Sequence, residues 1–171
     1  MARAFVSVGS NIDPETNVRT ALLRLSKETD LRAISTIYLT EPLGRQGQPP
    51  FYNCVIEIET SLPPAELKFG VLRNIEAGLG RRRSDDKFAP RAIDLDLILY
   101  NGLVMTTPEL TLPDPEILER PFLAITLSEI ASGLVLPGSQ SGIGEVAAKL
   151  SRTGMQPLRT YTDRIRREIL P

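Results

Sequence analysis

Residues 93–100 restrict the fold more than any other stretch, because an apolar strand there carries two acidic side chains. Most of its residues are strand-forming aliphatics, Pro90 stands at its entrance, and a glycine-containing turn follows at Asn101-Gly102. Residues two apart in a strand point to the same face. One face is therefore expected to carry Ile93, Leu95, Leu97 and Leu99, and the other Asp94, Asp96, Ile98 and Tyr100. Adjacent carboxylates on an apolar strand repel each other and lose hydration, and a divalent cation would relieve both costs.

The order of the expected elements indicates the fold class. Periodicity and turn residues predict strands over residues 5–8, about 31–39, 53–60 and 93–100, and helices over 14–28 and 61–78. Strand, helix, strand, strand, helix, strand is the ferredoxin-like, split βαβ layout of an α+β protein, with a mainly antiparallel sheet and helices on one face. The other face, with Asp94, Asp96 and Asn53, is expected to carry a site covered only by loops.

The helices and strands expected after residue 100 have less bearing on the candidate site. A short strand over 103–105 is expected to pair with the preceding strand across Asn101-Gly102, which is a hairpin dipeptide. Helices are expected over 121–130, 142–150 and 161–170. No linker divides the chain, so residues 1–171 are expected to form one domain, and the segment after about residue 140 has no assigned role.

Composition excludes several kinds of chemistry. The 171 residues carry a net charge of −1, which provides no global field for nucleic acid or an anionic membrane. A single cysteine, Cys54, excludes an intramolecular disulfide framework and is expected in the core. The chain has no histidine, so histidine bases and Ser-His-Asp triads are excluded. No apolar stretch is long enough for a signal peptide or a membrane span, and a cytoplasmic location is expected.

An arginine-rich segment precedes the acidic strand. Residues 81–91 contain five basic and two acidic side chains, and four of the basic ones are arginines. Arginine favours bidentate binding of phosphate, although such a run is also typical of a solvated loop or a nucleic-acid patch. Arg91 stands three residues before Asp94, so its head is expected near the carboxylates. A carboxylate pair for Mg²⁺ beside such a loop suits polyphosphate chemistry.

A second expected loop, over residues 40–50, contains two glycines and three prolines. Loops of this length inside a compact domain are often functional. Phe51 and Asn53 follow it on one face of the next strand, and Phe122 lies at the start of an expected helix. Two phenyl rings and an amide could enclose a flat heterocycle, although the aromatics could equally belong to the core.

The motifs resemble those of a known enzyme family. Residues 88–98, Phe-Ala-Pro-Arg-Ala-Ile-Asp-Leu-Asp-Leu-Ile, resemble the signature of the 6-hydroxymethyl-7,8-dihydropterin pyrophosphokinase family of folate biosynthesis. The resemblance covers about residues 4–135, through Val8-Gly9-Ser10-Asn11, Tyr38 to Gly44, Phe51-Tyr52-Asn53, Phe122 and Glu129-Ile130-Ala131. It implies the ferredoxin-like fold and transfer of the β,γ-diphosphate of ATP to the pterin hydroxymethyl group, with release of AMP.

The resemblance also implies roles for individual residues. Asp94 and Asp96 would hold two Mg²⁺ ions, and Arg81, Arg83 and Arg91 would act in catalysis on the phosphates. The pterin would be bound by Thr40, Pro42, Leu43, Phe51, Asn53 and Phe122. ATP, the co-substrate, would be bound by Arg73, Glu76, Phe88, Leu97, Thr111, Asp114 and Arg120. The partners would be these small molecules, without nucleic acid or membrane, and a monomer is expected, with a dimer as the alternative.

Two positions depart from the family pattern. Phe88 stands where members usually have Trp, and Asp114 stands where they usually have His. A carboxylate beside ATP should weaken nucleotide binding unless a neighbour such as Arg120 compensates. Two other hypotheses stay open at this point: a ferredoxin-like nucleic-acid-binding module, and a catalytically degenerate relative that only binds pterin.

Overall fold

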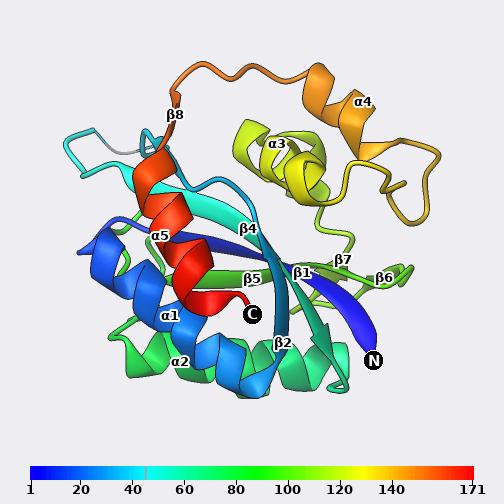
Figure 1. The fold of residues 1–171 in the computed structure, drawn as a ribbon, viewed down its shortest axis with the longest axis horizontal. Helices are drawn as coiled ribbons and strands as arrows, with labels where there is room; N and C mark the ends of the chain where they lie inside the picture. The colour runs from blue at the N-terminus through cyan, green and yellow to red at the C-terminus, as the bar shows by residue number, and fades with distance from the viewer. Residues whose placement is uncertain (45) are drawn as a thin grey trace.

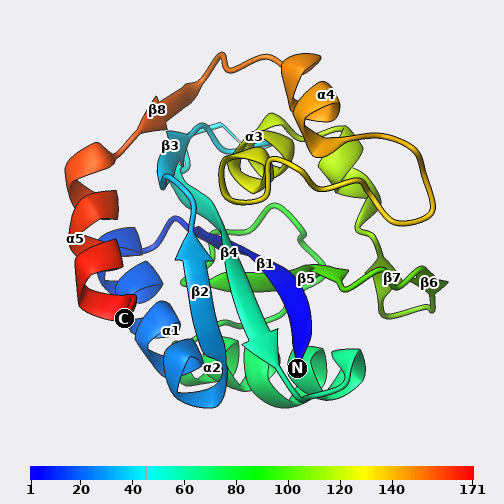
Figure 2. The same cartoon turned by 45° about the vertical axis from the view of Figure 1, so that its right-hand side comes forward.

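An antiparallel sheet with helices on both faces organises the computed structural model, which describes residues 1–44 and 46–171 (Figures 1 and 2). The strands are β1 (Ala2–Ser10), β2 (Asp30–Ile34), β3 (Tyr38–Thr40), β4 (Phe51–Thr60), β5 (Asp94–Tyr100), β6 (Met105–Thr106), β7 (Thr111–Leu112) and β8 (Met155–Pro157). The helices are α1 (Pro14–Glu28), the π-helical η1 (Glu66–Leu72), α2 (Arg73–Gly78), the 3₁₀ turn η2 (Pro115–Leu118), α3 (Pro121–Ile130), α4 (Ile143–Ala148) and α5 (Arg159–Ile169).

The sheet runs in the order β5-β1-β4-β3-β8, and β2 also pairs with β4. Every pairing in it is antiparallel. β1 and β4 lie at its centre and are buried along most of their length, which fits their aliphatic sequences. The predicted strand over 31–39 is divided into β2 and β3, and Ser35 lies between the two. Its N–H donates to the Val55 carbonyl and its Oγ accepts from the Val55 N–H, both at 3.0 Å.

Two hydrophobic clusters lie on opposite faces of the sheet. On one face α1, η1, α2 and α5 cover Val6, Val8 and Ile56. On the other, α3 and α4 pack over Phe5 and Val55. The prediction that helices cover one face only was therefore wrong, since apolar side chains on the second face also need burial. α3 and α4 cover only part of that face and leave the site beside them.

A bulge in β5 changes the predicted faces of its last residues. Phe5 pairs with Leu99 and Val6 with Leu97, so Ile98 is an extra residue in β5. Leu99 therefore packs with Ile98 against α3, and Tyr100 packs against the opposite cluster. The predicted alternation is right up to Ile98 and wrong for Leu99 and Tyr100.

The predicted hairpin across Asn101-Gly102 was also wrong. β6 pairs with β7 and not with β5. Asn101 instead bonds to β1: its Oδ1 accepts from the Arg3 N–H at 2.8 Å, and its N–H donates to the Arg3 carbonyl at 2.7 Å. These bonds hold the turn against β1, and the chain leaves the sheet there.

Other predictions were confirmed. Helices over 14–28 and 121–130 are α1 and α3, and those expected near 142–150 and 161–170 are α4 and α5. Cys54 is buried in the core, and burial raises the pKa of its thiol to about 12. In the part of the chain that the structure describes, every helix is too short or too polar to cross a membrane.

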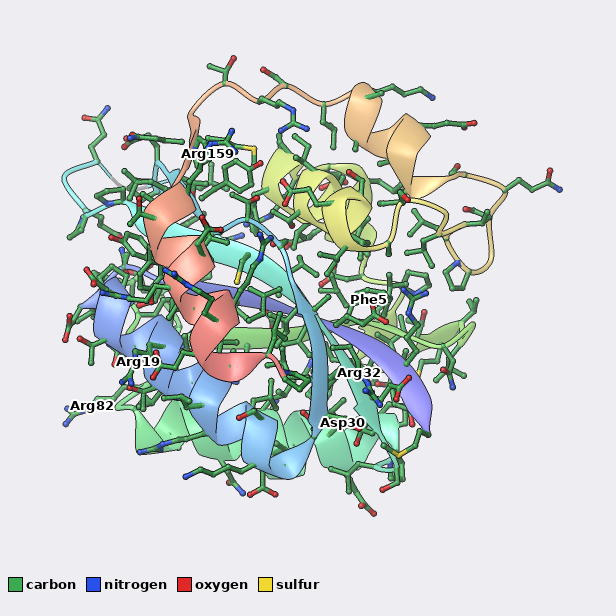
Figure 3. The ribbon with its side chains drawn as sticks, viewed as in Figure 1. Phe5, Arg19, Asp30, Arg32, Arg82 and Arg159 are labelled. Atoms are coloured by element: carbon green, nitrogen blue, oxygen red, sulfur yellow. The ribbon has the colours of Figure 1, made fainter. Side chains whose placement is uncertain are left out.

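The C-terminal segment closes one side of the molecule. β8 pairs with β3 at the edge of the sheet, and α5 packs against α1. Arg19 of α1, labelled in Figure 3, donates to Glu168 of α5 with an Nε–Oε2 distance of 2.8 Å. Ile165 of α5 is fully buried in the core. This segment is therefore an integral part of the fold.

Candidate active site

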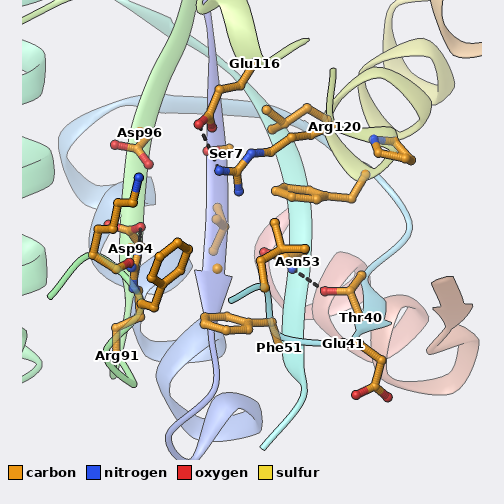
Figure 4. A pocket seen from close by; sticks show the side chains of 18 of the residues that line it. Ser7, Thr40, Glu41, Phe51, Asn53, Arg91, Asp94, Asp96, Glu116 and Arg120 are labelled. Carbon is orange, nitrogen blue, oxygen red and sulfur yellow. Dashed lines mark hydrogen bonds and ion pairs between the residues drawn. The ribbon is translucent and has the colours of Figure 1, made fainter. Parts of the chain in front are cut away.

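A cavity of about 810 Å³ opens on the second face of the sheet, beside the start of α3 (Figure 4). Side chains from β1, β3, β4 and β5 line it, together with the loop over 81–91, the start of α3 and residues 153–155. Pro121 occupies the first position of α3, where its missing N–H costs no helical hydrogen bond, and this places Phe122 at the cavity.

Strand register orders the cavity floor in rows. Asp94 lies opposite Gly9, and Gly9 lies opposite Asn53. In the neighbouring row Asp96 lies opposite Ser7. Across such pairs side chains share a face, at roughly 5 Å from strand to strand. The carboxylates thus lie at one end of the floor, and the Asn53 amide lies two strands away.

Gly9 leaves room for this arrangement. A Cβ atom built on Gly9 would lie 2.8 Å from Asn53 Oδ1, closer than real Cβ contacts. The Asn53 amide therefore lies over a backbone without a side chain. Its Nδ2 donates to Thr40 Oγ1 at 2.6 Å, which fixes the amide orientation. Its Oδ1 remains directed over Gly9 towards the cavity.

The carboxylate pair occupies the β5 end. Asp94 forms an ion pair with Arg91, with an NH1–Oδ2 distance of 2.5 Å, and its Oδ1 is 3.9 Å from Arg81 Nε. Burial first, then the carboxylates of Asp94 and Glu76, raise the pKa of Asp96 to about 7. Burial and the neighbouring carboxylates thus disfavour deprotonated Asp96 more than Lys68 favours it, and a cation in the cavity would stabilise its negative charge.

Oxygen ligands at this end come from two carboxylates. Among residues 1–44 and 46–171, no group of three or more His, Cys, Asp or Glu side chains is arranged to hold a metal ion. The pair alone thus forms a partial coordination site, which a ligand with its own oxygen atoms would have to complete.

Three arginines from the loop over 81–91 line the cavity, and two of them, Arg81 and Arg91, lie beside Asp94. The side chain of Arg81 is only 12% exposed, and its Nε–H has no hydrogen-bond acceptor within the described part of the chain. Arg81 also lines the cavity, and a buried donor without an acceptor on such a residue suits an anionic ligand. Arg91 also donates to the Lys87 carbonyl, while the more exposed Arg83 pairs with Glu76.

Glu76 is a structural neighbour of the cavity and does not line it. Its Oε1 accepts from the Leu95 N–H at 2.8 Å, and its Oε2 lies 2.9 Å from the Arg83 guanidinium. Burial raises the pKa of this carboxyl, while the bond from Leu95 opposes the shift. Glu76 thus holds β5 and the arginine loop together from behind the carboxylate pair.

Four other predicted residues also lie away from this cavity. Pro42 lines a separate recess of its own loop. The Leu97 side chain is buried in the core on the face covered by α1, η1, α2 and α5, because it alternates with Asp96. Arg73 stacks on Phe69, 4.3 Å from the ring centroid, and Thr111 lies in β7. The roles of all four, and of Glu76, in nucleotide or ligand binding remain predictions.

The remaining predicted residues are brought together around the cavity. They are Thr40, Leu43, Phe51, Asn53, Arg81, Arg83, Phe88, Arg91, Asp94, Asp96, Asp114, Arg120 and Phe122. Asp114 Oδ1 accepts from the Glu116 N–H at 2.9 Å and so caps η2. Arg120 pairs with Glu116 at 2.9 Å, so its charge is directed to a carboxylate other than Asp114.

Sequence reasoning gave no role to the Asn11 side chain, although it joins the two loops of the site. The buried Asn11 accepts from the Arg91 N–H at Oδ1, 2.8 Å away. Its Nδ2 donates to Gln48 Oε1 and to the Pro49 carbonyl at 3.1 and 3.2 Å. The signal available in sequence was a polar Ser-Asn pair at the end of a buried strand.

The chain is similar to a known protein family and to proteins that carry the name of that family's activity. The model of the family described as 7,8-dihydro-6-hydroxymethylpterin-pyrophosphokinase (HPPK) matches residues 5–132. The 2-amino-4-hydroxy-6-hydroxymethyldihydropteridine pyrophosphokinase of Haemophilus influenzae is 38% identical over 143 residues, 82% of this chain and 88% of that protein. The Bacillus subtilis protein of the same name is 40% identical over 130 residues, covering 74% and 77% of the two chains.

Solved structures show the same fold. The wild-type HPPK-DHPS of Plasmodium falciparum, crystallised with SDX-DHP, matches 98% of this chain with a TM-score of 0.66. The sequence identity is 12%, so this similarity concerns the fold alone. The chain spans 45% of the length of that solved chain.

Proposed function

The chain belongs to the 7,8-dihydro-6-hydroxymethylpterin-pyrophosphokinase family, and we propose that it transfers the terminal diphosphate of ATP to the hydroxymethyl group of 6-hydroxymethyl-7,8-dihydropterin, releasing AMP in folate biosynthesis. One observation carries the proposal: a single cavity joins a carboxylate pair and three arginines to an amide flanked by phenylalanines. A volume of about 810 Å³ lies within the usual range of small-molecule sites.

The carboxylate end is suited to the triphosphate of ATP with magnesium. Mg²⁺ prefers oxygen ligands and is often held by one or two carboxylates plus substrate phosphates, which fits Asp94 and Asp96. When bound, it would neutralise phosphate charge and favour in-line displacement. Arg81 and Arg91 would bind phosphate oxygens, and the lack of a hydrogen-bond acceptor for the buried Arg81 Nε–H among the described residues supports that role. The ion pair of Arg91 with Asp94 would then be exchanged for contacts to the ligand.

The amide end is suited to the pterin. Phe51 and Phe122 supply apolar faces for the ring, and Asn53 Oδ1 can accept from a ring N–H while its Nδ2 stays bonded to Thr40. A ring held there would direct its hydroxymethyl group across Gly9 towards the carboxylates. Positioning of the attacking oxygen against the phosphate supplies much of the catalysis in reactions of this class.

The strand order supports a ferredoxin-like core. Along the chain the elements follow the order β1, α1, β2 and β3, β4, α2, β5, in which β2 and β3 together take the place of the second strand. In the sheet, β1 lies between β5 and β4, as the split βαβ layout requires. The Asp94 and Asp96 carboxylates on the partly open face would repel a nucleic-acid backbone, which argues against the nucleic-acid-binding alternative. A cytoplasmic location and a monomer, with a dimer as the alternative, remain predictions.

The test is AMP release from ATP by the purified chain. AMP should form only when Mg²⁺ and the pterin alcohol are both present, in a 1:1 ratio to the pterin diphosphate. Calorimetric binding of pterin without AMP at any ATP concentration would instead support the degenerate, binding-only alternative. Salt-sensitive RNA binding that is indifferent to Mg²⁺, again without AMP, would support the nucleic-acid hypothesis.

Replacing Gly9 by alanine should weaken pterin binding with little effect on ATP. The added Cβ would lie 2.8 Å from Asn53 Oδ1 and displace the amide from the ring edge. We expect the KM for the pterin to rise about tenfold, because the substrate would lose about one hydrogen bond. Gly102→Ala is the control, because among the described residues no neighbouring atom lies within 4 Å of the Cβ atom that the substitution adds. Equal pterin KM values for the two variants would contradict the assignment of Asn53.

A further inference from the structure

The part of the chain that follows the family match also reaches the cavity. The family model ends at residue 132, yet Thr153, Gly154 and Met155 line the cavity beside Thr40. We propose that these three residues form the distal wall of the pterin subsite, and that Met155 determines which substituents the pyrimidine edge of the ring can carry. This inference rests on the proposed function and deepens it.

Strand pairing sets the position of Met155. β8 lies beside β3 (Figure 2) and pairs with it in antiparallel fashion. Met155 therefore lies opposite Thr40, and Thr40 lies opposite Phe51. These three side chains therefore share the face of the sheet that carries the cavity. In the strand order β5-β1-β4-β3-β8, Met155 is at the opposite edge from Asp94 and Asp96.

The orientation of the substrate follows from this order. A pterin whose 6-hydroxymethyl group points to the carboxylates carries that group on its pyrazine ring. Its pyrimidine ring, with the 2-amino and 4-oxo groups, then points away from β5. The side chain that this edge approaches beyond Thr40 is that of Met155. A methionine there offers a polarisable, apolar contact to a flat heterocycle.

The wall is anchored to the body of the protein. The Leu158 N–H donates to the Ile37 carbonyl at 2.8 Å, and the Ile37 N–H donates to Thr162 Oγ1 at 2.9 Å. Ile165 of α5 is fully buried in the core. Gly154, with a φ of 80°, adopts the left-handed conformation that turns the chain into β8. Fixed at these points, the wall limits the length of the subsite rather than acting as a lid.

The experiment compares Met155→Ala with Gln156→Ala. Gln156 is the next residue of β8, is exposed and does not line the cavity, so its variant controls for changes to the strand. For Met155→Ala we expect a roughly tenfold rise in the KM for the pterin, with the KM for ATP within twofold of wild type. The same variant should accept a pterin with an N-methylated 2-amino group better, relative to the parent pterin, than wild type does. Met155→Leu should restore most of the affinity and the discrimination.

Calorimetric titration with the pterin alone provides a second readout that does not require turnover. Equal pterin affinities for Met155→Ala and Gln156→Ala, with unchanged discrimination between the two pterins, would overturn the inference. A change confined to the KM for ATP would also overturn it, because the wall would then belong to the nucleotide. Wild-type protein that binds neither pterin nor ATP would overturn the proposed function instead, so the two failures are distinguishable.

Discussion

The Asp96→Asn variant is expected to lose turnover by about 10³-fold or more, because it removes one of the two carboxylates that we propose hold Mg²⁺ and several kcal/mol of transition-state stabilisation with it. Asparagine matches aspartate in size and keeps an oxygen, so the cavity should retain its shape. The loss should appear in kcat for AMP release at saturating ATP and pterin. It should not be restored by raising Mg²⁺ tenfold if both carboxylates are needed.

The same variant should be more stable than wild type when metal is absent. In the folded chain the pKa of Asp96 is raised to about 7, against 3.8 for an unperturbed aspartate. Between these values the folded state binds more protons than the unfolded state, so the wild-type free energy of unfolding falls as pH rises. The asparagine variant escapes this loss. Urea unfolding in EDTA should therefore show its advantage growing from pH 4 to pH 7 and levelling above.

Asp85→Asn is the matched control for Asp96. It removes the same charge from an exposed position in the arginine loop that does not line the cavity. Its turnover should stay within about twofold of wild type, and Mg²⁺ with ATP should raise its melting temperature as in wild type. The Asp96→Asn variant should lack that increase. Wild-type turnover in Asp96→Asn would show that the carboxylate does not hold the metal.

Replacing Arg81 by alanine should have the second-largest effect, a fall in kcat of about 10²–10³-fold, which is typical of losing one preorganised charged donor. The Arg81 side chain is largely buried and lines the cavity, its Nε lies 3.9 Å from Asp94 Oδ1, and its NH1 donates to the Arg82 carbonyl. The Nε–H has no hydrogen-bond acceptor within the described part of the chain, so a phosphate bound there would displace no hydrogen bond at that atom. The measurement is steady-state AMP release, with circular dichroism to confirm folding.

Arg82→Ala tests whether position, rather than loop charge, is responsible. Arg82 is adjacent in sequence, exposed and absent from the cavity lining (Figure 3). Both substitutions remove one positive charge, so a general electrostatic attraction for ATP would weaken equally in the two variants. Arg82→Ala should remain within about twofold of wild type in kcat. Equal losses in both variants would indicate that the loop attracts ATP only through its net charge.

Local patterns predicted much of this arrangement. The 3.6-residue periodicity predicted α1 and α3 at their observed bounds, and alternation predicted that Asp94 and Asp96 share a face. Both are properties of consecutive residues, whose directions follow from the backbone repeat. The same reasoning failed at Ile98, because the bulge there is required by pairing with β1, some ninety residues earlier in the chain.

The sequence also indicated the chemistry of the candidate site before the positions of its residues were known. Carboxylates, arginines, an amide and phenylalanines indicated the ligand classes, and most of these residues lie around one cavity. Glu76 and Leu97 do not, since Glu76 satisfies the Leu95 N–H and Leu97 faces the opposite core. Whether a polar side chain serves a ligand or its own backbone depends on which groups folding brings near it.

The chemistry available to residues 81–100 can be read from the chain alone, since the types and spacing of their charges do not depend on the fold. The distance from these charges to Asn53 depends on folding, because Gly9 lies between them through pairings remote in sequence. Folding likewise brings Met155 of β8 to the cavity. Local periodicity carries no information on which strands will be neighbours; the burial of the whole core selects that arrangement.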